Sequence, residues 1–354
     1  MKIRLIGRRN HLGIGTHYGY FSDALRQIWS GDIQELDLED QSALLAAAAE
    51  SESDDINISF VSMNLEGHFR GHNIQWIVFE STLIPEIVHS TLRAAQWVWV
   101  PSTWGRDILL ANHIDSAKID VVPEGVDPVI FQPCGIQPDQ PFKFLILGKA
   151  ERRKCIGETL HAFCAAFGAD PTVELVIKTN HFFHADAKRA ELEAFAAQSS
   201  SRIRIEWGDW STTQIRDLYH DCHVFVFPTR GEGWGLPLIE AMATGMPAMT
   251  TLYSAHRDFL ADSVTSVIPV EYDMTPVDCE EYRLFYQLQG QPMGEWAQPR
   301  VDSIARGMQH ARANYDQLRD YSLANSRDLR AKWNWRASAA RALAVLRERN
   351  LLSG

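Results

Sequence analysis

The string TRGEGWGLPLIEAMATG, residues 229–245, holds the residues whose types and spacing most clearly suggest chemistry. Pro237 suits the first turn of a helix, so the residues just before it should lie at a helix N-terminus. Backbone N–H groups and the helix dipole favour a phosphate at such a position, and glycine lets the backbone approach its ligand closely. The expected donors are the N–H groups of Gly233, Trp234, Gly235 and Leu236.

Two glutamates flank these donors. Glu240 should lie one turn inside the helix, where its carboxylate can accept two hydrogen bonds from a ribose diol. Glu232 precedes the helix and is expected to face the same ligand. The string as a whole therefore predicts a nucleotide site.

A second string, GKAERRKCIG at residues 148–157, follows an apolar strand and precedes a helix. Lysines at a strand end are well placed as point charges for a diphosphate. Lys149 and Lys154 are the expected pair. Two cations together with helix-end amides can stabilise a leaving diphosphate without a metal ion.

Metal ligands are not expected. No Asp-x-Asp stands at a strand end, and two histidine pairs, His68 with His72 and His181 with His184, lack further ligand partners. We therefore expect neither a metal nor a cofactor.

The elements that position these residues form an alternating pattern from Lys143 onward. Apolar strands at 143–148, 173–178, 202–207, 224–228 and 247–251 alternate with helical patterns at 156–168, 185–198, 213–220 and 237–244. Such alternation predicts a parallel sheet covered by helices on both faces. After about residue 300 the pattern is helical.

The N-terminal half begins with an apolar strand at residues 2–6, a glycine-rich turn GIGTHYG and a helical pattern from Phe21 to Trp29. This is the opening of a nucleotide-type strand–helix unit. The spacing is GxGxxxG and not the dinucleotide GxGxxG, which disfavours a nicotinamide cofactor. A helix at 41–49 and strands at 56–62, 74–79 and 97–100 should follow.

The stretch PEGVDPVIFQPCGIQPDQP, residues 123–141, holds five of the fifteen prolines and indicates a linker between two domains. A chain of 354 residues suits roughly two domains. The net charge of −11 disfavours nucleic acid as a partner. Five cysteines without a CxxC pair and an N-terminus without a long apolar segment predict a cytoplasmic protein, with room for peripheral membrane contact through a local basic segment.

The string at 229–245 resembles the Glu-x7-Glu signature of glycosyltransferase family 4, and Lys149 and Lys154 match that family's phosphate-binding pair. The resemblance implies a GT-B fold, in which two Rossmann-like parallel-sheet domains face each other across a cleft. It also implies a reaction that retains the anomeric configuration. Expected parts are an acceptor-side domain at 1–138, a nucleotide-sugar domain at 139–325, and a C-terminal helical segment at 326–354 that returns to the first domain.

By this resemblance Glu232 lies beside the donor hexose, residues 233–235 hold the sugar and pyrophosphate, and Gly13 and Gly15 lie beneath the donor phosphates. The segment WIVFESTLIP, residues 76–85, looks like a subgroup with FES where many members have a histidine. We assign Glu80 and Ser81 to the acceptor side. The resemblance extends from the first strand to about residue 340.

The predicted enzyme is thus a hexosyltransferase that uses a UDP- or GDP-sugar and a hydroxyl acceptor, which is a glycan, a lipid-linked saccharide or a small molecule. Glu232, Lys149 and Lys154 are its expected catalytic residues. Two alternatives stay open, a non-catalytic nucleotide-sugar-binding scaffold and an NAD-dependent oxidoreductase. The sequence leaves the nucleobase, the sugar, the acceptor and the oligomeric state open.

Overall fold

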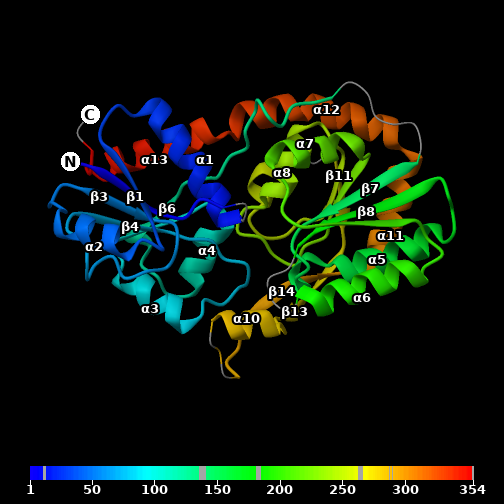
Figure 1. The fold of residues 1–354 in the computed structure, drawn as a ribbon, viewed down its shortest axis with the longest axis horizontal. Helices are drawn as coiled ribbons and strands as arrows, with labels where there is room; N and C mark the ends of the chain where they lie inside the picture. The colour runs from blue at the N-terminus through cyan, green and yellow to red at the C-terminus, as the bar shows by residue number, and fades with distance from the viewer. Residues whose placement is uncertain are drawn as a thin grey trace. The chain divides into compact units, whose positions relative to one another are not determined.

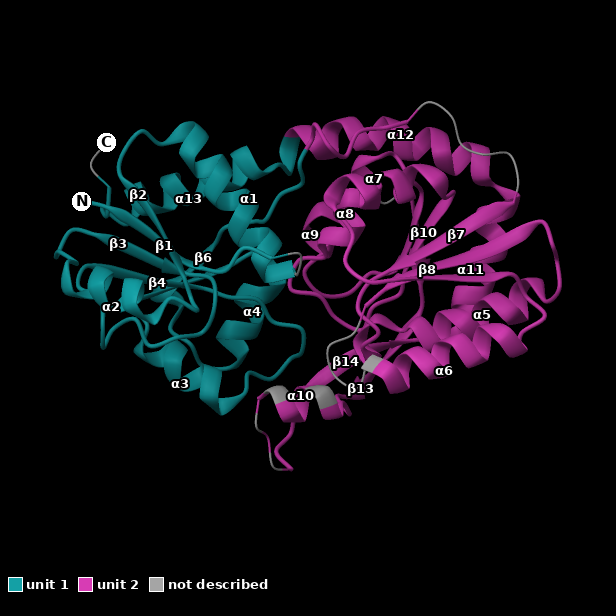
Figure 2. Ribbon diagram, viewed as in Figure 1, with its two compact units in different colours: residues 1–127, 332–354 teal, residues 128–331 magenta. Residues whose placement is uncertain are grey.

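The computed structural model describes residues 1–10, 13–134, 141–180, 185–261, 266–286, 288 and 290–352. The chain divides into two compact units (Figure 2). The first comprises Met1–Asp127 and Lys332–Gly354, and the second comprises Pro128–Ala331. The domain boundary expected at residue 138 and the histidines at 181 and 184 lie outside the described residues.

The first unit contains a six-stranded parallel sheet in the order β2-β1-β3-β4-β5-β6 (Figure 1). Its strands are β1 (Ile3–Gly7), β2 (Ile33–Asp37), β3 (Ile56–Ser59), β4 (His72–Trp76), β5 (Trp97–Val100) and β6 (Ile119–Val121). Its helices are α1 (Gly13–Ile28), α2 (Gln41–Ala49), α3 (Glu86–Ala94), α4 (Thr103–Ala111), the short η1 (Ser116–Lys118) and α13 (Trp335–Glu348). The central strands β1 and β3 are buried along their whole length, as expected for a parallel sheet covered on both faces.

The predicted glycine-rich turn at GIGTHYG is wrong, because α1 already begins at Gly13 and runs through these glycines. Among them, Gly15 allows close packing of the helix against the preceding segment. A Cβ built on Gly15 would lie 2.2 Å from the side-chain oxygen of Asn10 and 2.8 Å from the carbonyl oxygen of Arg8. A Cβ on Gly7 would similarly lie 2.5 Å from the ring of Tyr18.

The C-terminal helix α13 packs against α1 within the first unit. The ring of Trp335 stacks on the rings of His17 and Tyr20, with centroids 5.6 and 5.7 Å apart. The Val126 N–H donates to the Trp333 carbonyl at 3.0 Å. A Cβ on Gly125 would lie 2.3 Å from the Trp335 nitrogen, so only glycine allows this approach.

The second unit contains another six-stranded parallel sheet in the order β12-β11-β10-β7-β8-β9. Its strands are β7 (Phe142–Leu147), β8 (Val173–Thr179), β9 (Ile203–Trp207), β10 (Val224–Phe227), β11 (Ala248–Thr251) and β12 (Val267–Val270). Its helices are η2 (Arg152–Lys154), α5 (Ile156–Phe167), α6 (Ala185–Gln198), α7 (Thr212–Asp221), α8 (Leu236–Ala243), α9 (Arg257–Leu260), α10 (Glu280–Phe285), α11 (Val301–Ala313) and α12 (Tyr315–Lys332). The two parallel sheets confirm the predicted α/β class.

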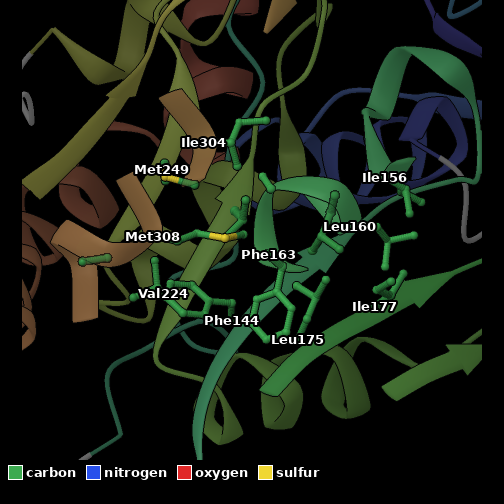
Figure 3. Packing of buried hydrophobic residues seen from close by; sticks show 14 of the residues in the cluster. Phe144, Ile156, Leu160, Phe163, Leu175, Ile177, Val224, Met249, Ile304 and Met308 are labelled. Atoms are coloured by element: carbon green, nitrogen blue, oxygen red, sulfur yellow. The ribbon is translucent and has the colours of Figure 1, made fainter. Parts of the chain in front are cut away.

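The core of the second unit joins α5 and α11 to one face of this sheet (Figure 3). Phe144 on β7 and Phe163 on α5 meet edge to face, with ring centroids 6.3 Å apart. Met308 on α11 and Met249 on β11 belong to the same buried cluster. This packing anchors β7, whose end carries Lys149 and Lys154, and β11, the neighbour of β10 in the sheet.

A short antiparallel pair, β13 (Tyr272–Pro276) and β14 (Glu295–Pro299), extends from the second unit together with α10. Its small core is built on Trp296, which is 1% exposed and packs edge to face with Tyr282 at 5.3 Å. The sequence did not predict this pair. Among the described residues, no helix has the length and apolar character needed to cross a bilayer.

Two helical glycines allow a matched test of the core. A Cβ on Gly307 in α11 would lie 2.4 Å from the Met249 sulfur, whereas a Cβ on Gly157 in α5 meets nothing within 4 Å. We expect Gly307→Ala to lower the stability by about 1–3 kcal/mol through overpacking. Gly157→Ala should be neutral or stabilising by up to about 1 kcal/mol. Thermal melts would check both, and equal melting temperatures for the two variants would contradict the packing described.

Candidate functional site

The two candidate strings lie side by side in the second unit. Strands β7 and β10 are parallel neighbours, so the loops that follow them leave the same edge of the sheet. The β7 loop carries Lys149 and the η2 turn, and the β10 loop carries Glu232 and leads into α8. In open α/β sheets ligands bind at this edge, outside the carboxyl ends of the strands.

Glu232 is paired with two cations. Its Oε1 accepts hydrogen bonds from Arg153 Nη1 and from Lys154 Nζ, each at 2.8 Å, and its Oε2 lies 3.0 Å from Lys154 Nζ. All three side chains are buried, with exposed fractions of 5% for Glu232, 5% for Arg153 and 8% for Lys154. The fold thus brings two of the candidate residues, Lys154 and Glu232, into direct contact.

The charge state of Glu232 follows from this pairing. Burial alone raises the pKa of its carboxyl, and the charges of Arg153 and Lys154 outweigh that effect, so its pKa lies below the usual value. Glu232 is therefore an ionised acceptor at neutral pH. It is not suited to donate a proton.

The loop that carries Glu232 is held by hydrogen bonds to the segment after β11 and to the η2 turn. The Glu232 N–H donates to Ser254 Oγ at 2.9 Å, and the Ala255 N–H donates to the Glu232 carbonyl at 3.3 Å. The Arg230 N–H donates to the Arg153 carbonyl at 2.9 Å, which ties this loop to the η2 turn. The position of the carboxylate is therefore fixed by both loops.

Lys149 is more exposed than Lys154 and belongs to the same group of charged side chains. Its Nζ lies 3.4 Å from Glu151 Oε1, and the other Glu151 oxygen lies 3.5 Å from Arg153 Nη2. The Lys149 side chain is 35% exposed. Three cations thus stand against the two carboxylates Glu151 and Glu232, and this local excess of positive charge suits an anionic ligand.

Helix α8 begins as the sequence predicts. Gly235 precedes it with a φ of 100°, a left-handed conformation that glycine adopts without strain, and Pro237 occupies the first turn. The first N–H groups of a helix have no carbonyl within the helix to bond. The Trp234 side chain is buried against Phe259, so only its main chain is placed for a ligand.

His256 contacts Gly235, the residue that precedes α8. Its Nε2 donates to the Thr251 carbonyl at 2.5 Å, and a Cβ built on Gly235 would lie 3.4 Å from the His256 Cβ. Burial lowers the pKa of His256, so the ring is neutral. A side chain at position 235 would therefore find ordinary contact distances here, and the positive φ is what favours glycine at this position.

Glu240 lies inside α8, where Tyr219 contacts it. The Tyr219 hydroxyl lies 3.2 Å from Glu240 Oε2 and 3.1 Å from the Pro237 carbonyl oxygen. Burial raises the pKa of the Glu240 carboxyl to about 8, and the hydrogen bond from Tyr219 offsets part of this rise. Glu240 is thus largely protonated at neutral pH, unlike Glu232.

The remaining candidates belong to the first unit. Gly13 is the exposed first residue of α1, and Gly15 is buried two residues later. Glu80 and Ser81 follow β4, and the Ser81 hydroxyl donates to the Leu83 carbonyl at 3.1 Å. Gly13 and Gly15 thus come after the carboxyl end of β1, and Glu80 and Ser81 come after the carboxyl end of β4, in the sheet of the first unit.

Sequence reasoning missed Arg153, Ser254, His256 and Tyr219. The basic run at 152–154 does not reveal which side chain points inward, and only the fold shows that Arg152 is exposed and Arg153 buried. Ser254 and His256 follow β11 without any motif, so no local signal marks them. Within the described residues, no group of three or more His, Cys, Asp or Glu side chains is arranged to hold a metal ion.

Part of the second unit matches a known family. Residues 134–275 match the family model described as glycosyl transferases group 1. Alpha-maltose-1-phosphate synthase of Mycolicibacterium smegmatis is 22% identical over 277 residues, which are 74% of this chain and 65% of that protein. D-inositol 3-phosphate glycosyltransferase of Segniliparus rotundus is 26% identical over 168 residues, 44% of this chain and 36% of that protein. The matches thus span less than two thirds of either curated relative.

Solved structures share the fold. Sucrose-phosphate synthase from Thermosynechococcus elongatus has a TM-score of 0.74 at 16% identity, with all of both chains covered. Anabaena HepE in complex with UDP and glucose has a TM-score of 0.74 at 9% identity, covering 98% of this chain and 100% of that chain. WaaG, a glycosyltransferase involved in lipopolysaccharide biosynthesis, has a TM-score of 0.67 at 13% identity, covering 97% and 99%. The fold is that of the GT-B glycosyltransferases.

The protonated state of Glu240 makes stability depend on pH. A carboxyl whose pKa is raised on folding stabilises the protein fully below its unfolded value of 4.5, and this contribution is lost as the pH rises through about 8. Glu240→Gln cannot ionise. Its melting temperature relative to wild type should therefore rise by several degrees between pH 5 and about pH 8 and then level off.

The control for this experiment is Glu193→Gln on α6, which removes an exposed carboxyl paired with Arg189. Its melting temperature relative to wild type should not follow the same curve. A Glu240→Gln difference that stays constant from pH 5 to pH 9 would contradict the raised pKa that partial burial gives this carboxyl.

Proposed function

We propose that this protein transfers a sugar from a nucleoside-diphosphate sugar to a hydroxyl group of an acceptor, with retention of configuration. The observation that carries the proposal is the contact of Lys154 with Glu232 directly before α8, within the family-matched residues. A carboxylate, two buried cations and a helix N-terminus on adjoining loops suit a ligand with both hydroxyl and phosphate groups.

The diphosphate would bind Lys149, Lys154 and the main-chain N–H groups of residues 233–236. Negative charge builds up on the leaving diphosphate as the glycosidic bond breaks, and fixed cations and dipoles stabilise this charge without reorganising. Lys149 is the partly exposed cation of the pair, so it can meet a ligand that enters from solvent. Gly13 and Gly15 of the first unit are assigned to the same donor.

Glu232 would orient the transferred sugar by accepting hydrogen bonds from its hydroxyl groups. Its low pKa keeps it an acceptor, which fits a hydroxyl-rich ligand. In a front-face reaction the acceptor proton passes to an oxygen of the departing phosphate, so no separate base is required. Retention itself rests on the resemblance to family 4.

Glu240 would bind the ribose hydroxyls, and Glu80 and Ser81 would lie on the acceptor side. UDP is the first nucleotide to test, since HepE was solved with UDP and with UDP-glucose. A saccharide is the first acceptor class to test, since WaaG acts in lipopolysaccharide biosynthesis. The first unit would contribute the acceptor side and the second unit the donor side.

The proposal is tested by incubating the protein with UDP-, GDP- and ADP-sugars, measuring nucleotide release, and then adding saccharide acceptors to the donor that is cleaved. Transfer with the anomeric configuration preserved supports it. Binding of a sugar nucleotide without release or transfer would favour a scaffold. A thermal shift with NAD but with none of the nucleotides would favour an oxidoreductase.

The diphosphate assignment predicts a loss of nucleotide affinity. Lys149→Ala combined with Lys154→Ala removes two charge-assisted contacts, so the affinity for the preferred nucleoside diphosphate should fall by about a hundredfold or more. Calorimetric titration measures this. Lys188→Ala, an exposed lysine of α6 that pairs with Glu191, is the control and should bind as wild type does. Equal affinity in the double variant would remove these lysines from the site.

A further inference from the structure

Arg153 is a buried cation without an assigned role in the proposed transfer. It lies in the η2 turn between the exposed Arg152 and the buried Lys154. Its Nη1 donates to the Gly231 carbonyl and to Glu232 Oε1, both at 2.8 Å. The guanidinium therefore joins a main-chain carbonyl and a carboxylate of the β10 loop.

Lys154 makes a different kind of contact with the same carboxylate. Its Nζ bonds both Glu232 oxygens and lies 5.0 Å from the centre of the Phe227 ring. A lysine is a single point charge on a flexible stem, whereas an arginine is a planar fork that binds several acceptors at once. A Cβ on Gly148 would lie 3.2 Å from the Lys154 Cδ, so glycine gives this stem the space it occupies.

In the proposed function Lys154 has two partners, the Glu232 carboxylate and the donor diphosphate. If Lys154 turns to the donor diphosphate, the Glu232 carboxylate loses one of its two cations while it stays buried. A buried carboxylate without a cation is strongly disfavoured. One cation must therefore remain on Glu232 when the donor binds.

We propose that Arg153 is the permanent counter-ion of Glu232, a positioning residue that frees Lys154 to bind the donor diphosphate. This inference rests on the proposed function. Arg153 keeps Glu232 ionised and in place through its joint contact with the Gly231 carbonyl, and Lys154 is the cation that changes partners. Glu232 thereby remains a hydrogen-bond acceptor for the sugar in the bound state.

The test compares Arg153→Met with wild type. In this variant Lys154 is left as the cation on Glu232, so its transfer to the diphosphate leaves a buried carboxylate that takes up a proton from solvent. Titrations with UDP, GDP and ADP at pH 7, in buffers of different ionisation enthalpy, count the protons taken up. We expect about one more proton per bound nucleotide than in wild type and an affinity lower by about tenfold or more.

The controls separate this role from a merely structural one. Arg153→Lys should restore the wild-type proton count, because it restores a cation. Arg152→Met, which removes the neighbouring exposed arginine that pairs with Asp278, should bind as wild type does. Wild-type affinity and proton count in Arg153→Met would overturn the inference.

A double variant keeps the inference testable if Arg153→Met folds poorly. Glu232→Gln removes the charge that Arg153 balances, so adding Arg153→Met to it should cost little further nucleotide affinity. An equal loss with and without Glu232→Gln would overturn the inference. If wild type binds none of the three nucleotides, the proposed function itself fails, and this inference with it.

Discussion

The site depends on one buried carboxylate held between two cations. Burial would make Glu232 reluctant to ionise, and the charges of Arg153 and Lys154 reverse that tendency. Neither cation is simply a surface charge, since both are buried with it. A triad of this kind gains little net stability from its pairing, and its value lies in fixing a charged group where a ligand can use it.

The fold brings this triad together through one strand pairing. Because β7 and β10 are neighbours, residues almost eighty positions apart in sequence meet at one edge of the sheet. The core that joins α5 and α11 to β7 and β11 holds the strands. The loops are held by the bond from the Arg230 N–H to the Arg153 carbonyl and by the bond from the Glu232 N–H to the Ser254 hydroxyl. The two glutamates differ in charge state because their environments differ. The cations beside Glu232 lower its pKa and keep it ionised, whereas burial raises the pKa of Glu240 and keeps it protonated.

Much of this arrangement could be predicted from the sequence, because the second unit follows simple periodicity. Helix α6 has the predicted bounds, and α8 begins where Pro237 and the glycines indicate. The error at GIGTHYG has a physical reason, since Gly15 allows a helix to pack closely against the preceding segment and does not form a turn. The inward orientation of Arg153 and the pair β13 and β14 depend on tertiary contacts that local sequence does not encode.

The central claim is that Lys154 and the N-terminus of α8 bind a diphosphate while Glu232 remains hydrogen-bonded to Arg153. A crystal structure of the protein with its preferred nucleoside diphosphate tests this most directly. The account predicts phosphate oxygens within hydrogen-bonding distance of Lys154 Nζ and of the first N–H groups of α8, with the bond from Arg153 to Glu232 intact. A diphosphate bound elsewhere, with Lys154 still on Glu232, would contradict it.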